Sequence, residues 1–297
     1  MNTEGNRMST EAEAMVMSID PGQEVAPPAD AFRFGKNWQR YVADYLDPER
    51  ERIATESLRT LLETDLSGKT FLDIGCGSGL FSLCAHKAGA REIVSIDVDP
   101  ESVAATTSLR ESVSAPDSWQ IIHGSILDEG LAERLSKFDV VYSWGVLHHT
   151  GNMDTAMRNA ASLVADGGLF AIAIYNRVTG RFLDSERWLR IKRRYNNSSR
   201  PVQILMETIY TAYWTAATLW DRQNPIRAAR EYKRSRGMAL RTDLIDWLGG
   251  YPYEFATPDE TVRFCEDQCG LRSRKVVPEE PLGTGNNEFV FEKPAAP

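Results

Sequence analysis

The stretch Asp73-Ile74-Gly75-Cys76-Gly77-Ser78-Gly79-Leu80-Phe81 decides the fold of this chain. A short apolar run, residues 70–72, precedes it, and a segment with apolar residues at helical spacing follows it. A strand that turns through glycines into a helix points backbone N–H groups and the helix N-terminus at whatever binds in the turn. The stretch therefore predicts the first strand, turn and helix of an α/β domain that binds a nucleotide-like ligand.

The spacing of the three glycines narrows the choice of ligand. Gly75, Gly77 and Gly79 stand at positions i, i+2 and i+4, whereas the dinucleotide-binding motif needs its third glycine at i+5, where this chain has Leu80. The Gly-Lys-Ser/Thr ending of a phosphate-binding loop is absent as well. We therefore expect a nucleoside ligand without a pyrophosphate, and S-adenosylmethionine (SAM) is the leading candidate for the cofactor.

The segments around the glycine turn alternate between strand-like and helix-like patterns. Helical patterns at 100–112 and 153–163 separate the apolar strand patterns, which is typical of a parallel, doubly wound sheet. The expected strands are residues 70–73, 92–97, 119–123, 138–143 and 168–175.

The C-terminal part returns to the same pattern after a long interruption. Thr257 followed by Pro258 and Glu260 is a strong helix start, and Gly270 marks the end of that helix. Two closing strands are expected at 271–277 and 287–292. The sequence thus predicts the following division: a disordered tail at 1–30, a helical cap at 31–68, a SAM-binding core at 69–179, a helical insertion rich in aromatic and basic residues at 180–256, and a C-terminal helix with closing strands at 257–297.

Composition argues against several classes of protein. Apolar residues make up 42% of the 297 residues, enough for a large core, and the net charge of -8 lacks the basic character of most DNA- and RNA-binding proteins. The four cysteines are irregularly spaced, so we expect reduced thiols and no metal site. No apolar run approaches the ~20 residues of a membrane span, and no secretory signal is evident, so a cytoplasmic location is expected.

Acidic and loop residues after the next strands extend the expected cofactor site. Asp97 ends the second strand at close to the ~20-residue distance at which an acidic side chain meets ribose hydroxyls, with Val98 beside it. Asp99, directly before Pro100, is expected to cap the following helix.

Loops at the carboxyl ends of the third and fourth strands complete that site. Ser125 and Ile126 are expected to edge the adenine, through a polar side chain and a backbone N–H. Trp144 and Gly145 follow the fourth strand, where open α/β sheets bind their ligands.

Taken together, residues 73–79, Asp97, 138–141 and 163–169 resemble the successive motifs of class I SAM-dependent methyltransferases. Within that superfamily the chain is most similar to small-molecule enzymes typified by the ubiquinone-biosynthesis O-methyltransferases. The resemblance implies a Rossmann-like, doubly wound α/β sheet of seven strands whose last strand is antiparallel. It also implies that the turn, with Asp73, Cys76 and its three glycines, contacts the methionine end and ribose of SAM. Ser125 departs from the Asp that many relatives carry after the glycine of the third strand.

Two adjacent histidines are the catalytic candidates. A base that deprotonates a hydroxyl or phenol beside a sulfonium needs a pKa near neutrality, which suits His148 or His149. His149 is favoured because a Thr-Gly-Asn loop follows it. The alternative is a structural histidine that caps the next helix or bonds across the core.

Aromatic residues mark the expected acceptor side. Trp38 in the cap, Tyr175 at the end of the fifth strand, and Trp247, Tyr251 and Tyr253 around a Gly-Gly-Tyr-Pro turn are candidates for substrate contact. Trp38 could equally anchor the cap.

The insertion also carries a basic run at 187–194 and an apolar helical stripe within 204–219. It is expected to pack as a lid. The alternatives are contact of the basic run with an acidic substrate, contact with RNA phosphates, and contact of residues 180–235 with an anionic membrane surface.

These observations predict a SAM-dependent methyltransferase that acts on a small molecule, at a hydroxyl or phenol oxygen. An RNA methyltransferase and a catalytically inert SAM-binding scaffold remain as alternatives.

Overall fold

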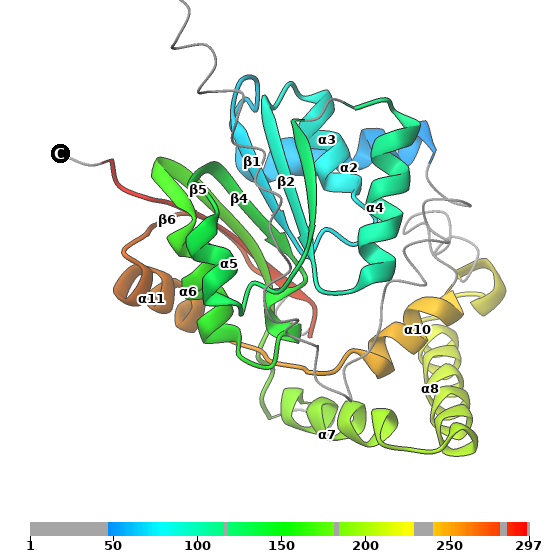
Figure 1. Ribbon diagram of the computed structural model, residues 1–297. Coiled ribbons are helices and arrows are strands. Elements are labelled where there is room, and N and C mark those ends of the chain that lie inside the picture. Colours follow the sequence, from blue (N-terminus) through cyan, green and yellow to red (C-terminus); the bar gives the residue numbers. More distant parts are fainter. Residues whose placement is uncertain (1–46, 116–117, 181–183, 229–239, 280–283, 296–297) are drawn as a thin grey trace, which may run out of the picture.

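The computed structural model describes residues 47–115, 118–180, 184–228, 240–279 and 284–295 (Figure 1). The predicted tail at 1–30, the cap up to residue 46 with Trp38, and residues 229–239 of the insertion lie outside the described residues.

A single seven-stranded sheet forms the centre of the fold, in the order β3-β2-β1-β4-β5-β7-β6 (Figure 1). β1 to β5 are parallel to their neighbours, whereas β7 pairs antiparallel with both β5 and β6. The predicted Rossmann-like sheet with an antiparallel last strand is therefore confirmed. The strands are β1 (Thr70–Ile74), β2 (Glu92–Asp97), β3 (Trp119–His123), β4 (Phe138–Trp144), β5 (Val164–Tyr175), β6 (Arg272–Val277) and β7 (Asn286–Glu292).

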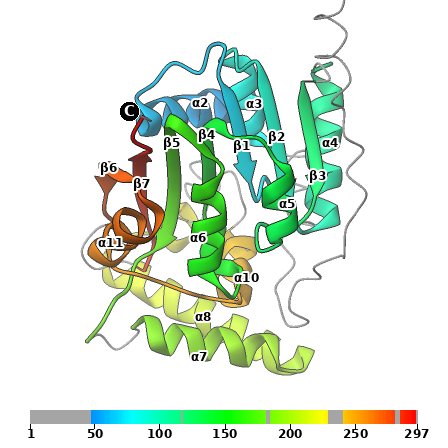
Figure 2. The ribbon, with the colours of Figure 1, turned by 60° about the vertical axis from the view of Figure 1, so that its left-hand side comes forward.

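Helices cover both faces of the sheet (Figure 2). Alternate strand residues point to opposite faces, as Phe71 and Leu72 do on β1, and both are fully buried. Phe71 packs in the cluster of α2, α3 and α4, while Leu72 packs in the cluster of α5, α6 and α11. The helices are α2 (Pro48–Leu62), α3 (Leu80–Lys87), α4 (Pro100–Ser112), α5 (Glu129–Arg134), α6 (Met153–Ser162) and α11 (Pro258–Cys269).

α2 is the described part of the expected N-terminal cap. Asp47 caps its N-terminus by accepting a hydrogen bond from the Arg50 backbone N–H at 2.8 Å. Leu58 and Leu62 are buried in the same cluster as Leu83 of α3. This helix therefore belongs to one of the two core layers.

The fifth strand is longer than predicted. β5 begins at Val164, which pairs with Phe138, and a register irregularity follows between Phe138 and Val140. The Gly167 backbone N–H donates to the Lys293 carbonyl at 2.9 Å. Pairing with β4 resumes between Val140 and Leu169, so the irregularity contains residues 165–168 with the Asp-Gly-Gly sequence.

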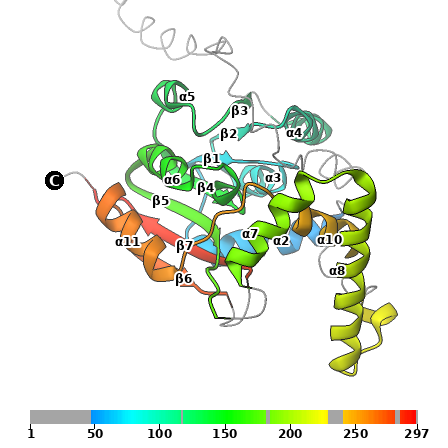
Figure 3. The ribbon, with the colours of Figure 1, turned by 90° about the horizontal axis from the view of Figure 1, so that it is seen from below.

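The insertion forms α7 (Ser185–Asn196), α8 (Arg200–Trp220) and α10 (Leu240–Gly249), which gather at the end of the sheet where the parallel strands finish (Figures 2 and 3). In the part of the chain that the structure describes, none of the helices is long and apolar enough to cross a membrane.

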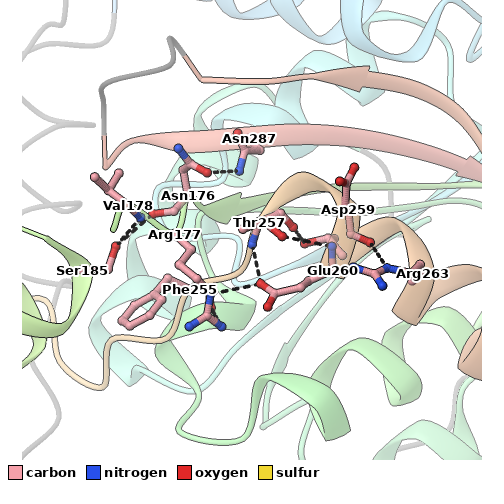
Figure 4. A network of polar contacts seen from close by, with 11 residues as sticks. Asn176, Arg177, Val178, Ser185, Phe255, Thr257, Asp259, Glu260, Arg263 and Asn287 are labelled. Atoms are coloured by element: carbon pink, nitrogen blue, oxygen red, sulfur yellow. Dashed lines mark hydrogen bonds and ion pairs between the residues drawn. The ribbon is translucent and has the colours of Figure 1, made fainter. Parts of the chain in front are cut away.

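Both ends of the insertion are fixed at one point of the core (Figure 4). Asn176, after β5, forms an isolated bridge with Ala256, and the Arg177 backbone N–H donates to the Ala256 carbonyl at 3.1 Å. The Arg177 guanidinium donates to Glu260 at 3.0 Å and lies 5.0 Å from the Phe255 ring centroid. Segments that are distant in the sequence therefore enter and leave the insertion side by side.

The helix after the insertion begins and ends as predicted. Thr257 and Glu260 form a reciprocal capping box, with hydrogen bonds of 2.8 and 3.2 Å, and Gly270 ends α11 with a left-handed φ of 66°.

Candidate functional site

The glycine turn connects β1 to α3 and is left-handed at three positions. Gly75, Gly77 and Gly79 have φ values of 73°, 56° and 78°, which disfavour residues with a β-carbon. A β-carbon on Gly79 would lie 2.8 Å from the Thr106 methyl and 3.2 Å from its Cα. The helix start thus lies against α4 with no room for a side chain.

Asp97 meets this turn from the end of β2. Its carboxylate accepts hydrogen bonds from the Gly77 N–H at 2.9 Å and the Asp99 N–H at 2.8 Å. Burial raises its pKa to about 6. An ionised carboxylate has about four acceptor positions, so two such bonds leave capacity for a pair of hydroxyls. Asp99 caps α4 through the Glu101 N–H, which confirms its predicted role.

Asp73 and Cys76 lie beneath the turn rather than on its open side. Asp73 is buried and accepts a 2.6 Å hydrogen bond from Ser82, which in turn contacts Ser95 at 2.7 Å. Burial raises the pKa of Asp73 to about 7. Cys76 is buried as well, with its sulfur 3.3 Å from the Thr106 hydroxyl, and burial raises the pKa of its thiol. Both side chains support the turn from the core.

The loops after β2 and β3 lie beside Asp97. The Val98 carbonyl is 3.1 Å from His123 Nε2. The Ser125 hydroxyl accepts from the Leu127 N–H at 3.2 Å, and the Ile126 side chain is buried in the core. At Ile126, the backbone and not the side chain is therefore placed to contact a ligand.

The residues at the end of β4 and directly after it lie in different surroundings. Trp144 is 41% exposed and its indole N–H donates to Glu288 of β7 at 2.7 Å. Gly145, with a φ of 74°, has open space where a β-carbon would stand. Val146 lies directly against the turn, since a β-carbon on Gly75 would be 2.4 Å from its methyl groups.

The two histidines follow in a short 3₁₀ turn, η1 (Leu147–His149), which the strand pattern did not predict. His148 is fully buried, and burial holds its pKa well below the usual value. Neither of its ring nitrogens has a partner in hydrogen-bond geometry among the described residues, although the Ala173 backbone favours the protonated ring.

His149 is half-buried and oriented by a residue distant in the sequence. Its Nδ1 lies 2.5 Å from the Pro252 carbonyl, an acceptor, so Nδ1 carries the proton and Nε2 is the basic nitrogen of the neutral ring. Burial lowers the pKa of His149 to about 4, below the near-neutral value expected of the base from the sequence, so the ring is a weaker base than predicted. The backbone also joins these segments, because the Glu254 N–H donates to the His148 carbonyl at 2.9 Å.

Aromatic rings surround the histidines. The Tyr175 ring centroid lies 4.0 Å from that of His148, 5.6 Å from Trp247 and 5.2 Å from Tyr253. The structure thus brings together three of the predicted acceptor residues with both histidines. Tyr251 stands next to them in sequence and makes no hydrogen bond or ring contact within the described residues.

Sequence reasoning did not single out Lys192, which belongs to the basic run at 187–194. Its side chain is fully buried beside Trp247 and Tyr253. The signal was the helical spacing, because Lys192 shares one face of α7 with buried Trp188 and Tyr195. Thr106, which packs on the glycine turn, gave no signal of its own.

Comparisons with known proteins identify the family of this chain. A family model described as a methyltransferase domain matches residues 42–216. The ribosomal protein L11 methyltransferase of Aliivibrio salmonicida is 30% identical over 149 residues, 45% of this chain and 48% of that protein. The ubiquinone biosynthesis O-methyltransferase of Brucella melitensis is 29% identical over 175 residues, 53% of this chain and 68% of that protein. The chain thus spans about half to two thirds of these relatives.

Solved structures share the fold. The magnesium protoporphyrin IX methyltransferase of Synechocystis, crystallised with bound SAH, has a TM-score of 0.51 at 12% identity, covering 87% of this chain and 94% of that one. An O-methyltransferase family protein from Burkholderia thailandensis has a TM-score of 0.50 at 13% identity, covering 83% and 58%. With the family match over more than half of its residues, this chain belongs to the methyltransferase-domain family of class I, SAM-dependent proteins.

Proposed function

We propose that this chain transfers the methyl group of SAM to a hydroxyl or phenol oxygen of a small molecule. The glycine turn and Asp97 fit the cofactor, since the Asp97 carboxylate keeps acceptor capacity for the ribose hydroxyls. The turn presents backbone N–H groups and the N-terminus of α3 beside it.

SAM, when bound, supplies a methyl group on a sulfonium that is open to in-line displacement. The chain must align the acceptor oxygen and remove its proton. Val146 lies against the glycine turn and directly precedes η1, so the cofactor residues and His149 follow the ends of two neighbouring strands, β1 and β4. The rings of Tyr175, Trp247 and Tyr253 offer a planar acceptor an apolar wall.

The orientation of His149 is the observation that carries the proposal. The Nδ1–H bond to Pro252 makes Nε2 the basic nitrogen, and the low pKa keeps the ring neutral across the physiological range. A neutral imidazole accepts a proton from a hydroxyl as the oxygen attacks the methyl group. His148 would then serve as a buried support for His149 and Tyr175.

The division of the chain follows the same proposal. Residues 69–179 with 257–297 hold the cofactor, and residues 180–256 form the acceptor side. The carboxyl ends of the parallel strands, where ligands bind in open α/β sheets, separate these two parts.

A labelled-methyl experiment tests this function. The full chain is incubated with SAM labelled in its methyl group and with fractionated cell extract, and labelled products are separated into small molecules, protein and RNA. We expect label in a small molecule, as an ether that survives mild base. Label in RNA would favour the exposed arginines of α7 as a phosphate-binding face. SAM binding with no labelled product in any fraction would support the inert scaffold instead.

A further inference from the structure

Lys192 is a buried cation in an aromatic enclosure. Its Nζ lies 3.9 Å from the Trp247 ring centroid, 4.8 Å from Tyr253 and 6.0 Å from Trp188. The same ammonium donates to the Trp247 carbonyl. Within the described residues no carboxylate lies within 4.0 Å of it. Among the residues that the structure describes, ring faces and a carbonyl are the groups that stabilise its charge.

That carbonyl belongs to the last turn of α10, where unpaired carbonyls and the negative end of the helix dipole favour a cation. Asn196, one turn after Lys192 on α7, donates to the Gly249 carbonyl at 2.8 Å. Two residues of α7 thus bind the carboxyl end of α10, one with a charge and one without.

The end of α10 leads directly to the histidines. A β-carbon built on Gly250 would lie 3.2 Å from His149 Cε1 and 3.6 Å from Lys192 Nζ. The imidazole and the ammonium therefore both lie close to Gly250. Two residues later, the Pro252 carbonyl receives the Nδ1–H of His149.

The groups that face this pair come from several elements. His148 belongs to η1, Tyr175 to β5, and Tyr253 to the segment after α10. Glu254 is directed to the Met153 N–H of α6, at 3.1 Å, and Asp246 of α10 has interactions of its own. Burial lowers the pKa of both histidines, and the Lys192 charge lowers it further, while burial lowers the pKa of Lys192 itself.

We propose that Lys192 is a positioning residue for the reaction: its buried ammonium fixes the end of α10 against η1 and disfavours protonation of His149, so that Nε2 stays available as the base. The inference rests on the proposed function of His149. In this inference Lys192, a basic residue of the insertion, affects the catalytic base His149. Lys192 itself needs no contact with cofactor or acceptor.

Two matched variants separate the charge from the contact. Lys192→Met removes both the charge and the bond to α10, whereas Asn196→Ala removes an uncharged bond to the same helix end, together with a bond to the Lys192 carbonyl within α7. We expect the acid limb of the kcat profile of Lys192→Met to move to higher pH by about one unit, since a nearby positive charge no longer opposes protonation. Asn196→Ala should keep the wild-type midpoint. Identical midpoints in wild type and Lys192→Met would overturn the proposal.

A measurement on the free protein distinguishes this inference from the proposed function. NMR of ¹⁵N-labelled histidine follows the tautomer and titration of His149 without SAM or an acceptor. We expect the Nδ1–H tautomer and a pKa below the usual value in wild type, with a shift toward the usual value in Lys192→Met. If that shift occurs but no methyl transfer exists, the positioning holds and the function fails.

The converse outcomes are equally informative. If transfer occurs but His149 titrates alike in both proteins, the function holds and the role of Lys192 fails. Should Lys192→Met not fold, Lys192→Gln keeps a donor for the Trp247 carbonyl without the charge. An ordinary pKa for His149 in wild type would overturn the inference with no variant at all.

Discussion

The glycine turn and the histidine side of this molecule are built in different ways. The turn is assembled from residues that are neighbours in sequence, and its geometry is mostly backbone: three left-handed glycines and N–H groups that meet Asp97. The histidine side draws on η1, β5, α7 and the segment after α10, whose side chains meet across a hundred residues of chain.

This difference teaches where specificity can change. A backbone-built site tolerates little substitution, because each glycine is fixed by conformation and by close neighbours. A site made of side chains from several elements can be altered residue by residue without loss of the sheet. Under the proposed function, the core determines the cofactor and the insertion determines the acceptor.

The largest effect is expected at the base. His149→Asn keeps an N–H donor for the Pro252 carbonyl but has no basic nitrogen, so we expect kcat to fall by about 10²–10⁴-fold while SAM affinity is unchanged. Steady-state kinetics with the identified acceptor, together with calorimetric SAM titration, measure both. His86→Asn, on α3 and away from the site, is the control. Wild-type turnover in His149→Asn would remove this residue from the mechanism.

The glycine turn provides the next effect. Gly79→Ala places a β-carbon 2.8 Å from Thr106 at a left-handed φ, so the turn must shift. We expect SAM affinity to fall by about 100-fold, about 2.7 kcal/mol. Gly167→Ala is the matched control, since Gly167 has φ 73° but open space around it, and only stability should fall. SAM binding by Gly79→Ala at wild-type strength would contradict the placement of the cofactor.

The pH dependence of cofactor binding tests Asp97. Since burial raises its pKa to about 6, and the ribose and sulfonium favour the ionised form, SAM affinity should increase as the pH rises through about 6. In the free protein the sign is opposite: the neutral acid stabilises the fold at low pH, and that contribution is lost as the pH rises through about 6. Calorimetric titrations from pH 5 to 8 measure this. A slope unchanged in Asp97→Asn would assign the effect to another group.

The smallest effect concerns the base of the insertion. Arg177→Met removes a partly exposed ion pair with Glu260 and a ring contact with Phe255, so we expect a loss of about 1 kcal/mol in unfolding free energy. Chemical denaturation measures it, with Glu260→Gln and the double variant completing a thermodynamic cycle. SAM affinity should stay at the wild-type value. A coupling energy of zero would mean that the ion pair between Arg177 and Glu260 does not stabilise the protein.

Much of the fold followed from local patterns. The strand–glycine–helix unit, the Asp99 cap and the Thr257–Glu260 capping box each depend on residues a few positions apart, and the structure has all three. The antiparallel position of β7 came from the family resemblance, because pairing between distant strands leaves no local mark.

The site was less predictable where burial decides the role of a residue. Lys192 reads as a surface cation until its helix face is compared with Trp188 and Tyr195. The tautomer of His149 depends on the Pro252 carbonyl, and the direction of Ile126 depends on the packing of α5 and α6. None of these follows from the type of residue alone.

The bridge between Asn176 and Ala256 holds the two ends of the insertion together, so the insertion can be exchanged as one segment. Its two ends are adjacent on the core, so a loop of a few residues could replace residues 180–255 and leave this bridge in place, or the equivalent segment of a relative could be grafted there. In evolution, such a junction allows one SAM-binding core to acquire new acceptors when a single segment of sequence is exchanged. For protein engineering, it defines two positions between which the insertion can be redesigned for a new acceptor while the SAM-binding core is kept.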